Sequence, residues 1–260
     1  MREPDDLALL IEAAREAGRI ACGFIGEDAA RWDKPGGEGP VTEADLAVND
    51  HLESALRGAR PDYGWLSEET EDDPERLDRD KVFIVDPIDG TRSFMDGSRT
   101  WAHALAVTEN GVPTAAVVYL PQRDMLYHAA AGRGAFLNGT PIGASPRDGL
   151  DQAQILAARP AMEATHWDRE VPAFKRAYRP SLAYRMALVA QGRFDGMLTL
   201  RPSWEWDIAA GALLLQEAGG ACSDRRGRAL RFNNPHPKLD GVVAGGQAIH
   251  AKVLAALRRR

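Results

Sequence analysis

One stretch decides how the rest of this chain is interpreted: Val82-Phe83-Ile84-Val85-Asp86-Pro87-Ile88-Asp89-Gly90-Thr91. Its first four residues form a continuous apolar run, which is typical of a buried strand that stops at an Asp-Pro pair. Two carboxylates at the mouth of such a strand are costly unless their charge is compensated. A divalent cation compensates it, and Mg²⁺ prefers hard oxygen ligands. The stretch therefore predicts a magnesium site, with a plain strand-to-helix turn as the simpler alternative.

The residues around the two aspartates set their directions. The proline between them fixes φ and Gly90 permits a sharp turn, so both side chains and the carbonyl oxygen of Ile88 can converge on one ion. The N–H groups of Gly90 and Thr91 then lie at a turn or helix start, where backbone amides favour a phosphate. We therefore expect a phosphate seat beside the metal site.

The composition of the 260-residue chain fits a soluble globular protein, since 44% of its residues are hydrophobic and 27% are charged. At this length we expect either two closely packed lobes or one large α/β unit. The net charge of -6 argues against a nucleic-acid polymer as the main partner, because phosphate contacts need clustered lysines and arginines. An acidic protein that handles a phosphate needs added positive charge, which bound metal supplies.

The sequence has no features of a membrane protein or a secreted protein. It lacks a run of about 18 apolar residues, and its acidic first residues do not form a signal region. Its two cysteines, Cys22 and Cys222, lie far apart, and we expect both to be reduced. The predicted location is the cytoplasm, without membrane contact.

Apolar periodicity predicts two helices followed by an antiparallel-rich sheet in the first half of the chain. The helices cover residues 7–25 and 42–57, and the Gly- and Pro-rich residues 31–40 are expected to form a loop between them. Strands are predicted at residues 82–85, 102–107, 114–120, 125–130 and 134–137.

The second half is predicted to alternate between strands and helices. Strands are expected at residues 155–158, 195–200 and 242–244, and helices at 172–177, 183–191, 207–218 and 248–258. Gly, Pro and Asp concentrate at residues 139–150, which is typical of a boundary. We therefore expect an N-terminal lobe of residues 1–142 and a C-terminal lobe of residues 143–260.

Four further acidic residues stand out, although each has a structural explanation. Asp45 follows Thr42 by three residues, as in a helix capping box. Glu68 and Glu69 form an acidic pair of a kind that is usually solvated. Asp207 is predicted at the start of a helix, where aspartate is a favoured N-cap. Taken singly, each is more readily explained by structure than by catalysis.

Taken together, the motifs resemble those of the inositol monophosphatase superfamily of Mg²⁺-dependent, typically lithium-sensitive phosphatases. The matching segments are Val41-Thr42-Glu43-Ala44-Asp45, Leu66-Ser67-Glu68-Glu69, Asp86-Pro87-Ile88-Asp89-Gly90-Thr91 and Trp206-Asp207-Ile208-Ala209-Ala210-Gly211. The resemblance spans most of the chain and implies a layered αβαβα sandwich of two closely packed lobes. The N-terminal α+β lobe would carry most metal ligands, and the smaller C-terminal α/β lobe would carry Asp207.

The resemblance also implies roles for individual residues. One Mg²⁺ ion would be held by Glu68, Asp86 and the Ile88 carbonyl. A second would be held by Asp86, Asp89 and Asp207. Water-linked binding near Glu68 would give this residue a catalytic part and allow a third ion. Thr91, hydrogen-bonded to Asp45, would orient a water molecule and help to deprotonate it for attack on phosphorus. Lys34 matches a family lysine near the metal site.

The substrate is indicated less directly than the reaction. Inositol phosphatases of this family commonly carry a glutamate seven residues before the last metal aspartate, where this chain has Leu200. Residues 202–207 and the Ser181-Leu182 pair instead resemble bacterial 3'(2'),5'-bisphosphate nucleotidases, whose small substrate is adenosine 3',5'-bisphosphate. This is the preferred interpretation, with Leu200, Trp204 and Lys34 as candidate substrate contacts.

Three alternatives stay open. Inositol 1-phosphate is the first, and histidinol phosphate is the second, because residues 89–94 and the Thr100-Trp101 pair resemble histidinol-phosphate phosphatases. Thirdly, some members of the superfamily act as partners of the transcription machinery independently of catalysis. The family often forms dimers, so a homodimer is also expected.

Overall fold

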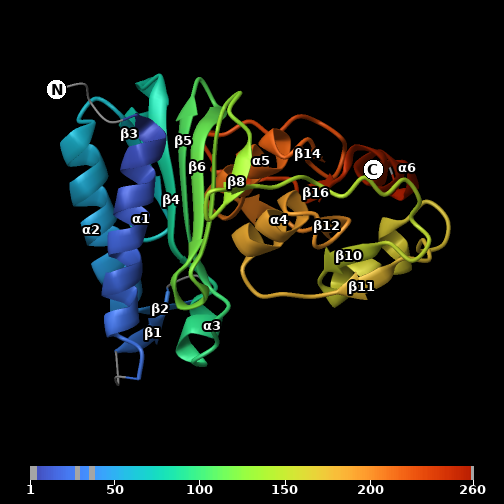
Figure 1. Ribbon diagram of the computed structural model, residues 1–260, viewed down its shortest axis with the longest axis horizontal. Helices are drawn as coiled ribbons and strands as arrows, with labels where there is room; N and C mark the ends of the chain where they lie inside the picture. The colour runs from blue at the N-terminus through green and yellow to red at the C-terminus, as the bar shows by residue number, and fades with distance from the viewer. Residues whose placement is uncertain (1–4, 27–29, 35–38, 259–260) are drawn as a thin grey trace.

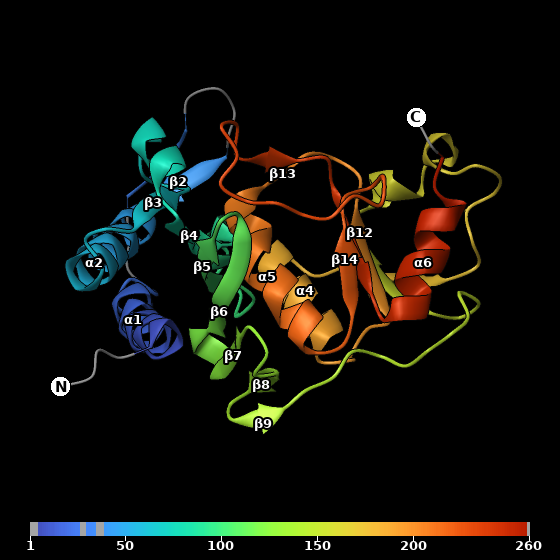
Figure 2. The same cartoon turned by 90° about the horizontal axis from the view of Figure 1, so that it is seen from above.

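The protein folds into five alternating layers of helices and sheets (Figures 1 and 2). The computed structural model describes residues 5–26, 30–34 and 39–258. From one side to the other, the layers are a helix pair, a seven-stranded sheet, a second helix pair, a five-stranded sheet and a last helix. Their helices are α1 (Asp6–Gly23) and α2 (Glu43–Ala59), α4 (Leu182–Ala190) and α5 (Glu205–Glu217), and α6 (Gln247–Ala256). This order confirms the expected αβαβα sandwich.

The larger sheet is mostly antiparallel, as predicted. Its strands lie in chain order, and only the first pair runs parallel. The strands are β3 (Gly64–Ser67), β4 (Lys81–Asp89), β5 (Ala102–Glu109), β6 (Val112–Leu120), β7 (Met125–Ala130), β8 (Ala135–Leu137) and β9 (Thr140–Pro141). The short helix α3 (Thr91–Met95) follows β4 directly.

The smaller sheet combines parallel and antiparallel pairs. Its order is β11 (Lys175–Ala177), β10 (Gln154–Ala157), β12 (Gly196–Thr199), β16 (Val242–Gly245) and β14 (Ala221–Ser223), and β16 runs antiparallel to the other four strands. Two ribbons lie outside both sheets: β1 (Arg31–Asp33) with β2 (Pro40–Thr42), and β13 (Ser203–Trp204) with β15 (Lys238–Leu239).

The apolar run at the start of β4 is continuous because both faces of this strand are covered. Side chains alternate between the faces of a strand. Phe83 and Val85 belong to the apolar cluster formed with α1 and α2, whereas Val82 and Ile84 belong to the cluster formed with α4 and α5. An unbroken run is what a strand buried on both faces requires.

The two N-terminal helices form for the reasons that the sequence indicates. In α1 the small and aliphatic residues Leu10, Ala14 and Ala17 recur at helical spacing and are fully buried. In α2 the expected capping box is present: the Thr42 side chain caps the backbone N–H of Asp45, and the Asp45 side chain accepts from the backbone N–H of Thr42. Each helix therefore has a fixed start and one apolar face toward the sheet.

The structure corrects three predictions. Residues 172–177 are not helical, because residues 175–177 form β11 and pair in parallel with β10. In so short a segment, the spacing of apolar residues does not distinguish a helix from a strand. The predicted loop at residues 31–40 has a paired ribbon at its two ends, while residues 35–38 lie outside the described part of the chain. The helix expected from Asp207 begins two residues earlier, at Glu205.

The division into lobes at residue 142 stays a proposal. The larger sheet uses residues 64–141 and the smaller sheet uses residues 154–245. One apolar cluster nevertheless contains residues of both sheets, such as Ile84 and Met197, packed around α4 and α5. The two helices are therefore a shared core layer.

Gly211 allows α5 to lie close to α4 in this layer, and its replacement should destabilise the protein. A Cβ atom at this position would lie 2.5 Å from the Met186 Cβ atom. Gly211→Ala should lower the free energy of unfolding by about 1–3 kcal/mol, the usual cost of overpacking. Gly58 in α2 is the matched control because a Cβ there meets nothing within 4 Å, and Gly58→Ala should raise stability by up to about 1 kcal/mol. Urea unfolding of both variants measures the difference, and equal effects would contradict close packing at Gly211.

Candidate active site

A bulge at the end of β4 brings the first two aspartates to one side of the sheet. Asp86 lies opposite Ala104, and Asp89 lies opposite Ala102, so three steps on β4 match two steps on β5. Without the extra residue, side chains three apart would point to opposite faces. The bulge restores a common face for both carboxylates. The sequence predicted that the two carboxylates converge. That prediction attributed the convergence to Pro87 and Gly90, whereas the structure shows that a bulge causes it.

A buried histidine holds this bulge. The Nδ1 atom of His103, on the neighbouring strand β5, is hydrogen-bonded to the carbonyl oxygen of Pro87. Because a carbonyl oxygen only accepts, Nδ1 is the donor. Burial lowers the pKa of His103 to about 4, so the ring is neutral. No local sequence signal identifies His103, which lies 14 residues after Asp89.

Asp86, Asp89 and Asp207 form a cluster suited to a cation. Their ligand atoms lie within 4.8 Å of one another. Asp207 reaches the cluster from the first turn of α5. Both carboxylate oxygens of Asp86 are buried and lack a hydrogen-bond partner among the described residues. Burial raises the pKa of Asp86 well above its usual value, and the negative charges of Glu68, Asp89 and Asp207 raise it further.

This donor set fits a hard divalent cation. An unpaired carboxylate in a dry site is costly, and a bound cation removes both the desolvation cost and the repulsion between neighbouring acids. Three carboxylates that converge from two elements supply the oxygen ligands that Mg²⁺ prefers.

The start of α4 orients Asp89. The Oδ2 atom of Asp89 accepts hydrogen bonds from the Ser181 hydroxyl at 2.7 Å and from the Ala183 backbone N–H at 2.6 Å. The Ser181 hydroxyl also caps the helix by accepting from the Tyr184 N–H. One carboxylate oxygen is thus fixed by the helix, which leaves the other free for a cation.

Thr91 and Asp45 are brought together as predicted. The Thr91 hydroxyl lies 3.2 Å from Asp45 Oδ1 and 3.2 Å from the carbonyl oxygen of Ile88. Burial raises the pKa of Asp45 to about 6, against the opposing effect of hydrogen bonds from Thr42. Gly90 precedes Thr91 with a φ of 103°, a conformation that favours glycine. It thereby allows β4 to turn directly into α3.

Lys34 and Glu68 lie at the edge of this cluster. The Lys34 ammonium group contacts Glu68 Oε1 at 2.8 Å and Glu69 Oε1 at 2.7 Å. Burial raises the pKa of Glu69 to about 7, and the charge of Glu68 contributes to the rise. Glu68 is therefore ion-paired and is not one of the three clustered ligands, although its charge acts on Asp86.

A cleft of about 600 Å³ opens beside these residues. Its lining includes Lys34, Glu68 and the two tryptophans Trp204 and Trp206. The indole rings stack at 4.6 Å between centroids, and the Lys238 ammonium group lies 3.5 Å from the centre of the Trp204 ring. Trp204 therefore lines the cleft, and its contact with a substrate stays a prediction.

Leu200 does not line this cleft. Its side chain is buried in the apolar cluster that surrounds the smaller sheet and α6. An aliphatic side chain is stabilised there by the neighbours that exclude it from water. A substrate contact at Leu200 stays a prediction, and the position of Leu200 outside this cleft does not support it.

Sequence reasoning missed a buried polar network that borders the site. The fully buried Glu205 accepts hydrogen bonds from the backbone N–H groups of Asn233 and Asn234 and from the Asn234 side chain. Arg76, 2% exposed, donates to the Asn233 side chain, to the Asn234 carbonyl and to Asp72. These residues are far apart in the sequence, and no motif connects them.

The cluster should make the stability of the protein depend on divalent cations. Mg²⁺ at a hundredfold excess over its Kd should add about 2.7 kcal/mol to the free energy of unfolding, because it binds the folded state only. Asp86→Asn should abolish most of this gain. Asp50→Asn, at an exposed position of α2, should retain it. Thermal unfolding with Mg²⁺ or with a chelator measures the effect. An unchanged response in Asp86→Asn would mean that the cation binds elsewhere.

Comparisons with known proteins agree with this geometry. The family model described as "Inositol monophosphatase family" matches residues 4–260. The chain is 34% identical to an inositol-1-monophosphatase of Mesorhizobium japonicum, over 97% of this chain and 96% of that protein. It is 33% identical to the Nus factor SuhB of Escherichia coli, over 97% and 95% of the two chains.

Solved structures show the same likeness. The IMPase of Thermotoga maritima superposes with a TM-score of 0.80 at 27% identity, over 97% of this chain and 96% of that one. Among the described residues, no helix is long and apolar enough to cross a membrane. Since the family model covers nearly the whole chain and the acidic cluster lies at the family motifs, this protein belongs to the inositol monophosphatase family of metal-dependent phosphatases.

Proposed function

We propose that this protein is a Mg²⁺-dependent phosphomonoesterase whose preferred substrate is a 3',5'-bisphosphate nucleotide such as adenosine 3',5'-bisphosphate. The observation that carries the reaction class is the buried, unpaired carboxylate of Asp86 within the cluster. Asp86, Asp89 and Asp207 would hold one ion. Glu68, Asp86 and the Ile88 carbonyl would hold another, and a third would bind near Glu68. Both of these ions would compete with Lys34 for the Glu68 carboxylate.

The chain's own groups divide the chemistry between them. Bound Mg²⁺ supplies positive charge at the phosphate and makes a nearby water molecule more acidic. The Thr91 hydroxyl orients this water, and Asp45 receives a proton through Thr91. The pKa of Asp45, about 6, is close to neutral pH, as a general base requires. The N–H groups of Gly90 and Thr91 would hold the phosphate oxygens.

Substitutions at Thr91 test this role. Thr91→Ser keeps the hydroxyl and should have a mild effect, whereas Thr91→Ala should lower turnover by about a hundredfold or more, because the proton path to Asp45 is lost. Steady-state kinetics at saturating Mg²⁺ measure turnover, and calorimetry should find little change in metal affinity. Equal losses in the two variants would instead indicate that the threonine methyl group acts by packing.

The nucleotide proposal is supported by two cationic groups, one against Trp204 and one near Asp207. Lys238 lies over one face of Trp204, while Trp206 stacks on the ring. The exposed Arg201 is close enough to oppose the rise that burial causes in the pKa of Asp207. A substrate with a second phosphate would use such cations, and a purine that replaced the Lys238 ammonium on Trp204 would gain about 1–3 kcal/mol from stacking.

Inositol 1-phosphate is the second candidate. The relative from Mesorhizobium japonicum is named for this activity. A polyol needs acceptors for its hydroxyl groups, and the residue at the family's glutamate position, Leu200, is buried away from the cleft. This position is the reason to rank the polyol below the nucleotide.

A phosphate-release panel distinguishes the substrates. The catalytic efficiency on adenosine 3',5'-bisphosphate should exceed that on inositol 1-phosphate by at least about tenfold, or roughly 1.4 kcal/mol, with histidinol phosphate below both. Lys238→Met should reduce the nucleotide reaction and leave the inositol reaction unchanged. The matched control is Lys252→Met, at an exposed lysine of α6 that pairs with Asp148. Comparable or reversed efficiencies would replace the nucleotide with inositol 1-phosphate.

A non-catalytic role and a homodimer are separate proposals. The Escherichia coli relative is named as a Nus factor, so contact with the transcription machinery is the partner to test. A pull-down with Asp89→Asn, which should be inactive but folded, separates such binding from catalysis.

A further inference from the structure

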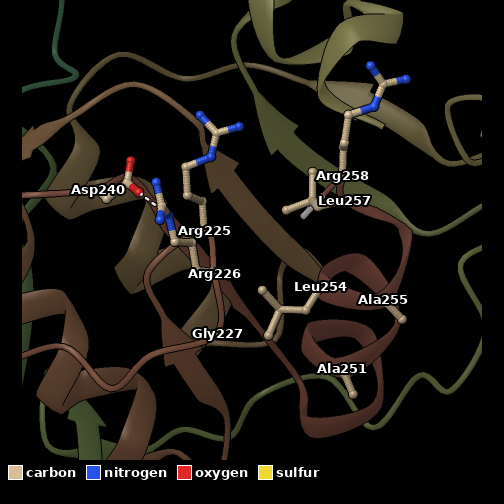
Figure 3. A pocket seen from close by; sticks show the side chains of 9 residues that line it. All are labelled: Arg225, Arg226, Gly227, Asp240, Ala251, Leu254, Ala255, Leu257 and Arg258. Atoms are coloured by element: carbon tan, nitrogen blue, oxygen red, sulfur yellow. Dashed lines mark hydrogen bonds and ion pairs between the residues drawn. The ribbon is translucent and has the colours of Figure 1, made fainter. Parts of the chain in front are cut away.

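A second cavity, of about 520 Å³, lies between α6 and the turn at residues 225–227. Figure 3 shows Arg225 and Arg226 on one side of it, and Leu254, Leu257 and Arg258 on the other. None of the residues that we assign to catalysis, metal binding or substrate binding lines this cavity. Its volume is within the range of about 300–1,000 Å³ that is typical of small-molecule sites.

The lining of this cavity is cationic, although the protein as a whole carries a net charge of -6. Its charged residues are three arginines and Asp240. Asp240 pairs with Arg226 at 2.9 Å, so the other two guanidinium groups are not neutralised by it. Among the described residues, the Arg258 side chain has no ion-pair partner. An anion is therefore the charge that this lining attracts.

Arg225 is held in place and still has donors to offer. Its Nη1 atom donates to the Leu200 carbonyl oxygen at 2.7 Å. A guanidinium group has five N–H donors in a planar fork. One of these donors binds the Leu200 carbonyl oxygen, which fixes the position of the guanidinium group. The other donors remain available to a ligand. This arrangement suits recognition of a carboxylate or phosphate, which arginine binds through two parallel hydrogen bonds.

The wall opposite Arg225 is mostly apolar. Ala251, Leu254, Ala255 and Leu257 line it from α6 and the residue that follows. Leu254 is half-buried and faces the cavity (Figure 3). Gly227 lies close to Leu254, because a Cβ atom on Gly227 would be in van der Waals contact with the Leu254 Cδ1 atom, at 3.5 Å. An inorganic anion has no apolar part that could contact this wall.

We propose that the cavity binds a small amphipathic oxyanion, in which a carboxylate or phosphate is attached to an apolar body. Arg225 and Arg258 hold the anionic group, and the half-buried Leu254 contacts the apolar body. Arg226 stays paired with Asp240 and closes one side. The carboxylate and the phosphate share this chemistry, and the experiment below distinguishes them.

Isothermal titration calorimetry of the full chain, in the presence of a chelator, tests the proposal. The probes are hexanoate and hexylphosphonate, a phosphonate that a phosphatase does not hydrolyse, and each represents one source of the anion. Inorganic phosphate and hexan-1-ol represent the two halves of the ligand. At least one amphipathic anion should bind at least tenfold more tightly than either half, and the stronger of the two identifies the anionic group.

Substitutions locate the binding site. Arg258→Gln and Leu254→Ser should each weaken the stronger probe by at least about tenfold, the first through the anion and the second through the apolar body. Arg231→Gln, at an exposed arginine outside the cavity, should leave binding unchanged. Circular dichroism verifies that each variant is folded. Absence of binding, equal binding of inorganic phosphate, or insensitivity to Arg258→Gln and Leu254→Ser would each overturn the proposal.

Discussion

The repulsion among buried carboxylates is the constraint on which the rest of the structure depends. Asp86 and Asp89 come from β4 and Asp207 comes from α5, and the ligand atoms of all three lie within 4.8 Å of one another. The contacts that bring them together must offset the free-energy cost of desolvating the carboxylates and the repulsion between their negative charges. The scaffold must therefore be rigid enough to hold them before a cation arrives. The continuous cover on both faces of β4 provides such rigidity, since a strand buried on two sides has little freedom to shift.

Each carboxylate is held in position by a different structural feature. Asp86 depends on the bulge, which His103 fixes through the Pro87 carbonyl. Asp89 depends on two hydrogen bonds from the start of α4. Asp207 is placed by α5, whose close contact with α4 requires a glycine. The layer of α4 and α5 thus positions two ligands and also supplies the apolar core shared by the sheets.

Local patterns predicted the parts of the fold and site that local physics determines. The apolar run before Asp86, the capping box at Thr42 and the contact of Thr91 with Asp45 follow from short segments or from the family motifs. Residues 175–177 were wrongly expected to be helical, because the pairing partner that makes them a strand lies about 20 residues away. His103, Glu205 and Arg76 were missed for the same reason. A buried polar residue reveals its role only when its distant partners are known.

The position of Glu205 has a consequence for how the site region can open. This buried side chain lies two residues before Asp207, and its oxygens are satisfied by residues 233 and 234, which are held in turn by Arg76. If that loop detached alone, the buried Glu205 carboxylate would lose its hydrogen-bond donors, and the Arg76 guanidinium group would keep only Asp72. Opening of the loop is therefore tied to fraying of the first turn of α5. The two segments should exchange their amide hydrogens as one cooperative unit, so that the metal ligand is lost only when the loop is lost with it.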